Sequence, residues 1–270
     1  MYFTEKLNKI IQKNNSLLCI GLDPDPSLIP ENMTVLEFNL GIISATTDLV
    51  CAYKPNFAFY EAMGPEGVDT LKKTIESIPE AIPIIGDAKR GDIGNTAKAY
   101  AKAIFDYFNC DAATVNPYLG FDSVEPFINY KEKEVFILCR TSNAGAVDFQ
   151  SLLCNGLPAP RHLFEIVAQK ASEWNKYGNI GLVVGATYPE ELDIIRKNYP
   201  ETLLLVPGVG AQGGDLKSVI DLGVDAKKRG VIINSSRQIL YASKGKDFAA
   251  AARKIAKRLQ EQINEYRNSD

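Results

Sequence analysis

The chain has almost no histidine, and this narrows the chemistry it can perform. Its 270 residues include one histidine, His162, which follows a proline-containing segment at the expected start of a helix. A Ser-His-Asp or Cys-His mechanism needs a histidine beside its nucleophile, and no neighbouring aspartate or cysteine supports one. A zinc site built from several histidines is also excluded. We therefore expect His162 to be a surface or structural residue, and lysines and carboxylates to carry any proton transfer.

The cysteines, the charge and the hydropathy exclude further classes of protein. The five cysteines form no CxxC pair, and an odd number fits poorly with a disulfide framework. Cys19, Cys51 and Cys139 lie in apolar runs, where we expect buried free thiols. The net charge of −3 does not indicate a nucleic-acid partner, and no apolar run approaches the ~20 residues that span a bilayer. The N-terminal segment also lacks the apolar core of a signal peptide, so we expect a cytoplasmic protein without a membrane or nucleic-acid partner.

Short apolar runs instead alternate with helix-like segments along the whole chain. Each run is almost continuously hydrophobic, which is typical of parallel strands covered on both faces. The eight strand candidates are 16–23, 51–56, 83–89, 112–118, 135–142, 180–187, 202–209 and 230–236. Eight βα units predict an α/β fold of the (β/α)₈ TIM-barrel, phosphate-binding type, as a single domain over residues 1–270.

An open doubly wound sheet is the alternative fold. Its GxGxxG fingerprint is absent after the first strand candidate, and the segment 207–210 matches it only in part and comes too late in the chain. The long irregular stretch from Ser142 to about Pro160 is expected to be an extended βα loop, and loops of that length are often functional.

Polar residues follow the apolar runs where a barrel carries its active site, at the C-terminal strand ends. In the third run, Asp87 and Lys89 are two residues apart and so face the same side of a strand. With Lys54 from the second run and with Asp92, they would form an alternating array in which each charge keeps its neighbours ionised. Asn95 or Thr96 is the expected cap of the next helix. A purely structural salt-bridge network is the alternative, but buried ion pairs are costly and often replaceable.

A phosphate site is predicted on the opposite side of the barrel mouth. Residues 206–215 form a glycine-rich segment after the seventh run, and Arg237 follows the eighth. Loops at these two positions commonly bind phosphate, and arginine can add a bidentate contact. The glycines could instead serve only tight turns. Together, the phosphate site and the charge array indicate a small phosphorylated substrate.

Four motifs resemble the orotidine 5′-phosphate decarboxylase family, in its longer bacterial-type branch. They are Leu-Asp-Pro-Asp-Pro at 22–26, Tyr-Lys-Pro-Asn at 53–56, Asp-Ala-Lys-Arg-Gly-Asp-Ile-Gly-Asn-Thr at 87–96 and Pro-Gly-Val-Gly-Ala-Gln-Gly-Gly at 207–214. The resemblance extends from about residue 16 to 242. It implies decarboxylation of orotidine 5′-monophosphate (OMP) to UMP, the last step of UMP synthesis, with neither a cofactor nor a metal.

The resemblance also implies a role for each site residue. Lys89 would protonate C6 of the pyrimidine, Asp87 would lie beside the substrate carboxylate, and Lys54 would order the array. Asp92 and Thr96 would reach the partner's site across a homodimer interface. The substrate-binding residues would be Asp23 on the ribose, Ser142 on the pyrimidine, Gln212 between base and phosphate, and Pro207, Ser236 and Arg237 around the phosphate.

Two positions depart from the family pattern. Ser236 stands where the family often has glycine, and Tyr241 does not align with a tyrosine that is often found nearby. Both concern phosphate binding more than the reaction.

Three other functions stay open. A related barrel enzyme would decarboxylate or cleave a sugar phosphate with Mg²⁺. Such an enzyme would place a metal-binding carboxylate where this chain has Lys54, whose charge would repel the ion. A catalytically inactive barrel would only bind a nucleotide. A Schiff-base enzyme would need an uncharged lysine, whereas Lys89 lies between carboxylates.

Overall fold

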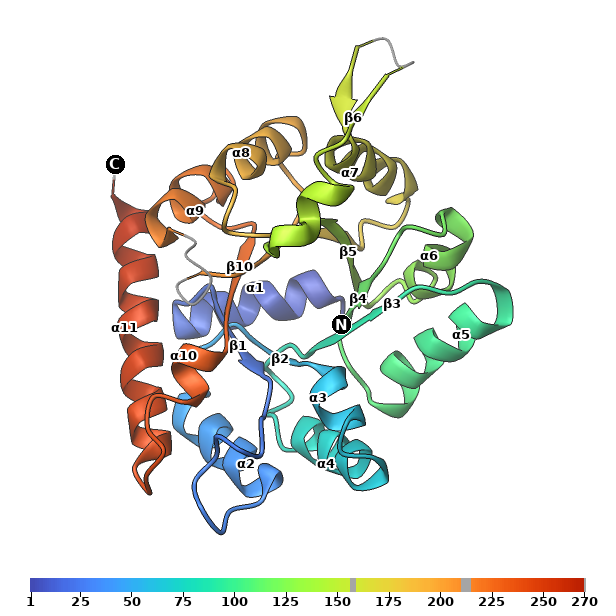
Figure 1. Cartoon of the computed structure of the whole chain (residues 1–270). Helices are drawn as coiled ribbons and strands as arrows, with labels where there is room; N and C mark the ends of the chain where they lie inside the picture. Colours follow the sequence, from blue (N-terminus) through green and yellow to red (C-terminus); the bar gives the residue numbers. More distant parts are fainter. Residues whose placement is uncertain (156–158, 210–214, 270) are drawn as a thin grey trace.

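The computed structural model describes residues 1–155, 159–209 and 215–269, and it has eight parallel strands arranged as a barrel (Figure 1). Around the sheet the order is β2-β1-β10-β9-β8-β5-β4-β3, and the bridges Tyr53–Ile84 and Asn56–Asp87 bring β2 alongside β3. The predicted TIM barrel is confirmed. The strands are β1 Leu18–Leu22, β2 Ala52–Pro55, β3 Ile85–Arg90, β4 Ala112–Val115, β5 Glu134–Arg140, β8 Ile180–Val184, β9 Leu204–Pro207 and β10 Val231–Ser235.

Helices lie between the strands and cover the outside of the barrel (Figure 1). Their starts follow local sequence signals: Thr34 and Glu37 form a capping box at α2, and Pro189 occupies the first turn of α8. The helices are α1 Phe3–Asn14, α2 Val35–Thr46, α3 Phe57–Glu61, α4 Pro65–Glu76, α5 Gly94–Lys102, α6 Phe121–Ile128, α7 Leu163–Trp174, α8 Pro189–Asn198, α9 Leu216–Gly223, α10 Arg237–Leu240 and α11 Phe248–Asn268. A π-helical turn, Ala103–Tyr107, continues α5.

The predicted cap of α5 is wrong. Ile93 is the N-cap residue and makes no side-chain capping bond, while Gly94 begins the helix with a φ of 55°. Glycine tolerates this left-handed conformation, so the backbone makes the turn without a polar side chain at Asn95 or Thr96. Asp92 accepts the N–H of Ile93 at 2.8 Å instead.

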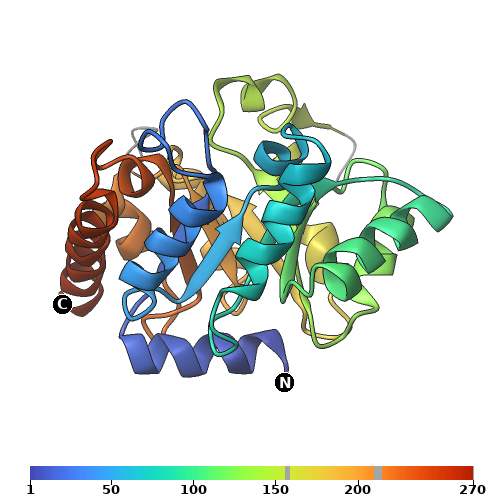
Figure 2. The same cartoon turned by 90° about the horizontal axis from the view of Figure 1, so that it is seen from below.

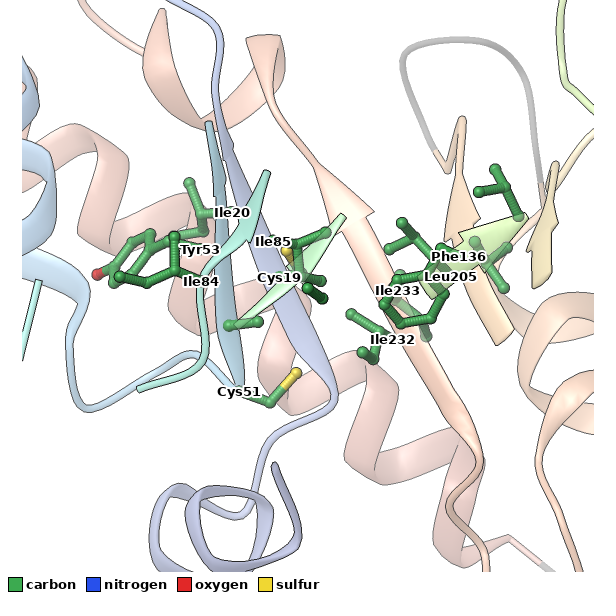
Figure 3. Packing of buried hydrophobic residues seen from close by; sticks show 14 of the residues in the cluster. Cys19, Ile20, Cys51, Tyr53, Ile84, Ile85, Phe136, Leu205, Ile232 and Ile233 are labelled. Carbon is green, nitrogen blue, oxygen red and sulfur yellow. The ribbon is translucent and has the colours of Figure 1, made fainter. Parts of the chain in front are cut away.

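Apolar side chains from the strands fill the barrel, as Figure 3 shows for Ile85, Phe136 and Ile233. Cys19, Cys51 and Cys139 are buried free thiols, as predicted. Helix α1 crosses the N-terminal end of the barrel, at the bottom of Figure 2. The ring of Phe3 meets that of Phe136 edge-on with centroids 6.0 Å apart, so α1 closes the end of the core opposite the predicted site.

The last helix, α11, runs along the outside of the barrel beside α2 (Figure 1). Phe248 stacks on Phe38 with ring centroids 5.1 Å apart, and Arg253 forms two hydrogen bonds to the carboxylate of Asp48. This contact gives the amphipathic C-terminal segment its partner. Of the helices in the described ranges, none is both long and apolar enough to cross a membrane.

The stretch after β5 is more ordered than the predicted loop. It contains a 3₁₀ turn, η2 Ala144–Asp148, and a short antiparallel pair, β6 Leu153–Cys154 with β7 Arg161–His162. We call residues 141–155 and 159–162 the excursion; Figure 2 shows it at the end of the barrel opposite α1. His162 precedes α7, and its Nδ1 lies 2.8 Å from the carbonyl oxygen of Ser151, in line with a structural role.

Candidate active site

Three charged side chains from β2 and β3 meet at the C-terminal mouth of the barrel. Asp87 Oδ2 accepts a hydrogen bond from Lys54 Nζ at 2.8 Å, and Asp87 Oδ1 accepts one from Lys89 Nζ at 2.6 Å. The side chains of Lys54 and Asp87 are buried, whereas that of Lys89 is 50% exposed. Asp87 is therefore fixed between two ammonium groups, and about half of the Lys89 side chain remains open to solvent.

The end of β3 departs from a regular strand at these residues. The pairing of β3 with β4 shifts register between Gly86 and Arg90, and Lys89 has a φ of 47°, in the left-handed region that non-glycine residues rarely adopt. Such strain is typical of functional sites, where surrounding contacts hold it. The predicted meeting of Asp87 and Lys89 therefore occurs on an irregular strand end rather than a regular pleat.

Thr114 on β4 holds this irregular end, and sequence reasoning did not identify it. Its buried hydroxyl donates to Asp87 Oδ1 at 2.9 Å and accepts the backbone N–H of Lys89 at 3.0 Å. One hydroxyl thus positions both members of the pair. The sequence signal that could have identified Thr114 is a hydroxyl side chain within an apolar strand, and this signal is weak by itself.

The electrostatic environment keeps the buried pair ionised. Burial alone would raise the pKa of Asp87, but the ammonium groups of Lys54 and Lys89 outweigh it and hold that pKa far below its ordinary value. Burial likewise opposes the charge on Lys54, but the carboxylates of Asp87 and Asp23 outweigh it and raise the Lys54 pKa. Lys54 and Asp87 are thus a preorganised pair of full charges held away from bulk water.

A pocket at the mouth extends from Lys54 and Asp87 of this array to the predicted phosphate side. Two of its buried carboxylate and amide oxygens, Asp23 Oδ1 and Asn234 Oδ1, have no hydrogen-bond partner among the residues described. Unpaired buried oxygens are costly, so both are available to hydroxyl groups of a ligand. Asn234 was not identified from the sequence. The pocket is lined by Asp23, Lys54, Asn56, Asp87, Pro207, Gly208, Val209, Asn234, Ser235, Ser236 and Arg237.

The phosphate-side residues follow β9 and β10. Ser236 is the N-cap residue of α10, and Arg237 begins that helix with its side chain at the pocket. The backbone of Gly21 on β1 makes room for Ser236, because a Cβ there would lie 1.9 Å from Ser236 Oγ. Gln212 lies outside the described residues.

The remaining predicted residues lie around the rim. Ser142 follows β5 and packs against Gly185, where a Cβ would come within 2.8 Å of the Ser142 Cα. Asp92 is partly exposed and makes no ion pair to any side chain in the described part of the chain, and Thr96 is exposed. Within one chain the charge array thus contains three of the four predicted residues, without Asp92. No group of three His, Cys, Asp or Glu side chains within residues 1–155, 159–209 and 215–269 could hold a metal ion.

The chain is similar to known proteins over its full length. It is 54% identical over 267 residues to an orotidine 5′-phosphate decarboxylase of Dehalococcoides mccartyi, covering 99% of both chains. A protein of the same name from Herpetosiphon aurantiacus is 53% identical over 260 residues, 94% of this chain and 95% of that one. The solved OMP decarboxylase of Leishmania donovani superposes with a TM-score of 0.87 at 42% identity, covering both chains completely. Residues 16–255 match the sequence profile of a family to which this chain therefore belongs, the orotidine 5′-phosphate decarboxylase / HUMPS family.

Proposed function

We propose that this protein decarboxylates orotidine 5′-monophosphate to UMP, with Lys89 as the proton donor. The observation that carries the proposal is the half-exposed Lys89 ammonium 2.6 Å from an Asp87 carboxylate that is itself held by Lys54. The identity of 53–54% to two named OMP decarboxylases over nearly the whole chain supports the same reaction.

The array accounts for each step of the bond change. Asp87 lies beside the substrate carboxylate, and the repulsion between the two negative groups falls as carbon dioxide leaves. The bond between C6 and the carboxylate carbon breaks, its electron pair stays on C6, and the Lys89 cation stabilises that charge. Lys89 then transfers a proton to C6 and regains one from solvent, to which its side chain is half exposed.

The opposite side of the pocket binds the parts of the substrate that do not react. Arg237 and the backbone around Ser236 hold the phosphate, and Asp23 accepts a hydrogen bond from a ribose hydroxyl. Ser142, after β5, contacts the pyrimidine, and Gln212 bridges the base and the phosphate. Binding energy from the distant phosphate then helps to place C6 against Lys89.

Lys54 argues against the magnesium-dependent sister reaction. Its buried ammonium lines the pocket and pairs with Asp87 at 2.8 Å, at the point where that reaction would need a metal-binding carboxylate. A divalent cation there would face a buried positive charge.

The first test follows OMP absorbance with purified protein in EDTA. Wild-type protein and the surface control Lys254→Ala should consume the substrate, whereas Lys89→Ala should not, although it should still bind UMP. Substantial turnover by Lys89→Ala would overturn the role of Lys89. No turnover of OMP by folded wild-type protein would move the function to the sugar-phosphate reaction or to nucleotide binding alone.

We propose further that the protein works as a homodimer in which Asp92 and Thr96 complete the partner's site. Exposed apolar side chains lie in the segments after β3 and β4: Ile93 directly follows Asp92, and Tyr118, 81% exposed, follows β4. A second copy would cover these side chains. It would also bring Asp92 to an array that Asp92 does not join within one chain.

Mixing two inactive variants tests this arrangement. Lys89→Ala and Asp92→Asn subunits should regain about one quarter of wild-type activity after exchange, because half the dimers are mixed and one of their two sites is intact. No recovery, with mixed dimers present, would place Asp92 in the site of its own chain.

We also propose that the protein acts in the cytoplasm. Its five cysteines are free thiols, four of them buried, which suits a reducing compartment.

A further inference from the structure

We propose that Arg140, at the end of β5, is a positioning residue that fixes the segment carrying Ser142 for recognition of the pyrimidine. The proposal rests on the proposed function through the role of Ser142. Arg140 has one of the most deeply buried charged side chains of the chain, at 1% exposure. An arginine this deeply buried needs partners to offset its lost hydration.

Two of those partners come from the start of α8. Nε of Arg140 donates to the carboxylate of Glu191 in the first turn of that helix. The guanidinium carbon lies 3.7 Å from the ring centroid of Tyr188, the N-cap residue of α8. The charge is thus compensated by an ion pair and a cation–π contact, and both tie β5 to α8.

The third partner of Arg140 belongs to the excursion. Nη1 of Arg140 lies 3.4 Å from Gln150 Oε1, and the same oxygen accepts the backbone N–H of Thr141 at 2.8 Å. Gln150 Nε2 donates back to Thr141 Oγ1 at 2.9 Å, and that hydroxyl donates to Asn143 Oδ1 at 2.6 Å. The residues on both sides of Ser142 are therefore held by one network that ends on Arg140.

The backbone of Arg140 also helps to position the segment that carries Ser142. Its carbonyl oxygen accepts the N–H of Gly185 at 2.6 Å, and Gly185 is the glycine against which Ser142 packs. The next residue, Ala186, donates to the carbonyl of Pro207 at 2.9 Å, on the phosphate side of the pocket. Ser142 is thereby placed relative to the phosphate-binding residues.

Arginine is required for this task because its guanidinium acts in three directions at once. The planar group offers Nε to Glu191, Nη1 to Gln150 and its face to Tyr188. A lysine supplies a single point charge and cannot make this set of contacts. Arg140 itself does not line the pocket, so it acts through the segment and not on the substrate.

The test compares two ligands that share a phosphate but not a base. Calorimetry with UMP and with ribose 5-phosphate is run on wild type, Arg140→Lys, Gln150→Ala and the control Arg253→Met, which removes a surface arginine–carboxylate pair. Gln150→Ala removes the network from a partly exposed position without leaving a buried charge unpaired. It therefore keeps the test valid even where an Arg140 variant fails to fold.

We expect Arg140→Lys and Gln150→Ala to weaken UMP binding about tenfold, the effect of losing one or two well-placed hydrogen bonds, and to change ribose 5-phosphate binding less than about twofold. Equal weakening of both ligands would show general structural damage and overturn the proposal, as would unchanged UMP binding. Failure of wild-type protein to bind UMP at all would overturn the proposed function instead. The two failures can be distinguished, because the second one is measured with wild-type protein alone.

Discussion

The phenol of Tyr241 joins the predicted ribose and phosphate contacts of the substrate pocket, since it donates to the backbone carbonyl of Asp23 at 2.9 Å. The same oxygen accepts the N–H of Asp25 at 2.7 Å. Tyr241 directly follows α10, the helix that begins with Arg237, so one side chain links the ends of β10 and β1. The predicted ribose and phosphate contacts are thereby held at a fixed separation.

Removing the hydroxyl group of Tyr241 should weaken substrate binding. We expect Tyr241→Phe to raise KM about 3- to 10-fold, the effect of one or two lost hydrogen bonds, with a smaller change in kcat. Steady-state kinetics with OMP measures this, and Tyr177→Phe at the surface is the control. An unchanged KM would show that the ribose and phosphate contacts are positioned without Tyr241.

The contact between Gly21 and Ser236 gives a second prediction. In Gly21→Ala the new Cβ would lie 1.9 Å from Ser236 Oγ, so the Ser236 side chain next to Arg237 must move, and we expect KM to rise severalfold. Adding Ser236→Gly removes the obstructing side chain and should restore most of the affinity. If the double variant binds no better than the single one, the clash is not the cause.

The hydroxyl of Thr114 should matter for turnover more than for binding. Thr114→Val keeps the shape but removes the hydrogen bond to Asp87 and the acceptor for the Lys89 N–H. Loss of a hydrogen bond to a charged group costs roughly 1.5–3 kcal/mol, so kcat should fall about 10- to 100-fold with little change in KM. Thr46→Val, which removes a buried hydroxyl elsewhere, is the control. An equal loss of kcat in both would point to stability instead.

Glu134 makes the stability of the fold depend on pH. It begins β5 at the N-terminal end of the barrel, is 2% exposed, and burial raises the pKa of its carboxyl to about 8. The unfolded chain releases this proton near pH 4.5, so between pH 4.5 and 8 the folded state binds more protons and this group lowers stability as the pH rises.

Glu134→Gln should remove that dependence. At pH 8 the free energy of unfolding should rise by on the order of 3 kcal/mol, and at pH 5 it should change much less. Urea unfolding at both pH values measures this, with the exposed Glu201→Gln as control. Equal effects at the two pH values would show that Glu134 does not titrate in this range.

Much of the site could be predicted because it follows local patterns. Eight apolar runs separated by amphipathic segments determine a barrel, and polar residues at the ends of those runs must gather at one mouth. Asp87 and Lys89 are only two residues apart, so the sequence already places both at the same strand end.

The supporting contacts depend on which distant segments the closed barrel brings together. Thr114 meets Asp87 across 27 positions of sequence and Tyr241 meets Asp23 across 218. The Arg140 guanidinium finds Glu191 51 positions away. No local pattern encodes such pairs, because they arise from strand register and from loop ends that converge only when the sheet closes. The charged residues of the site were therefore determined by the sequence itself, and the tertiary structure decided what holds them in place.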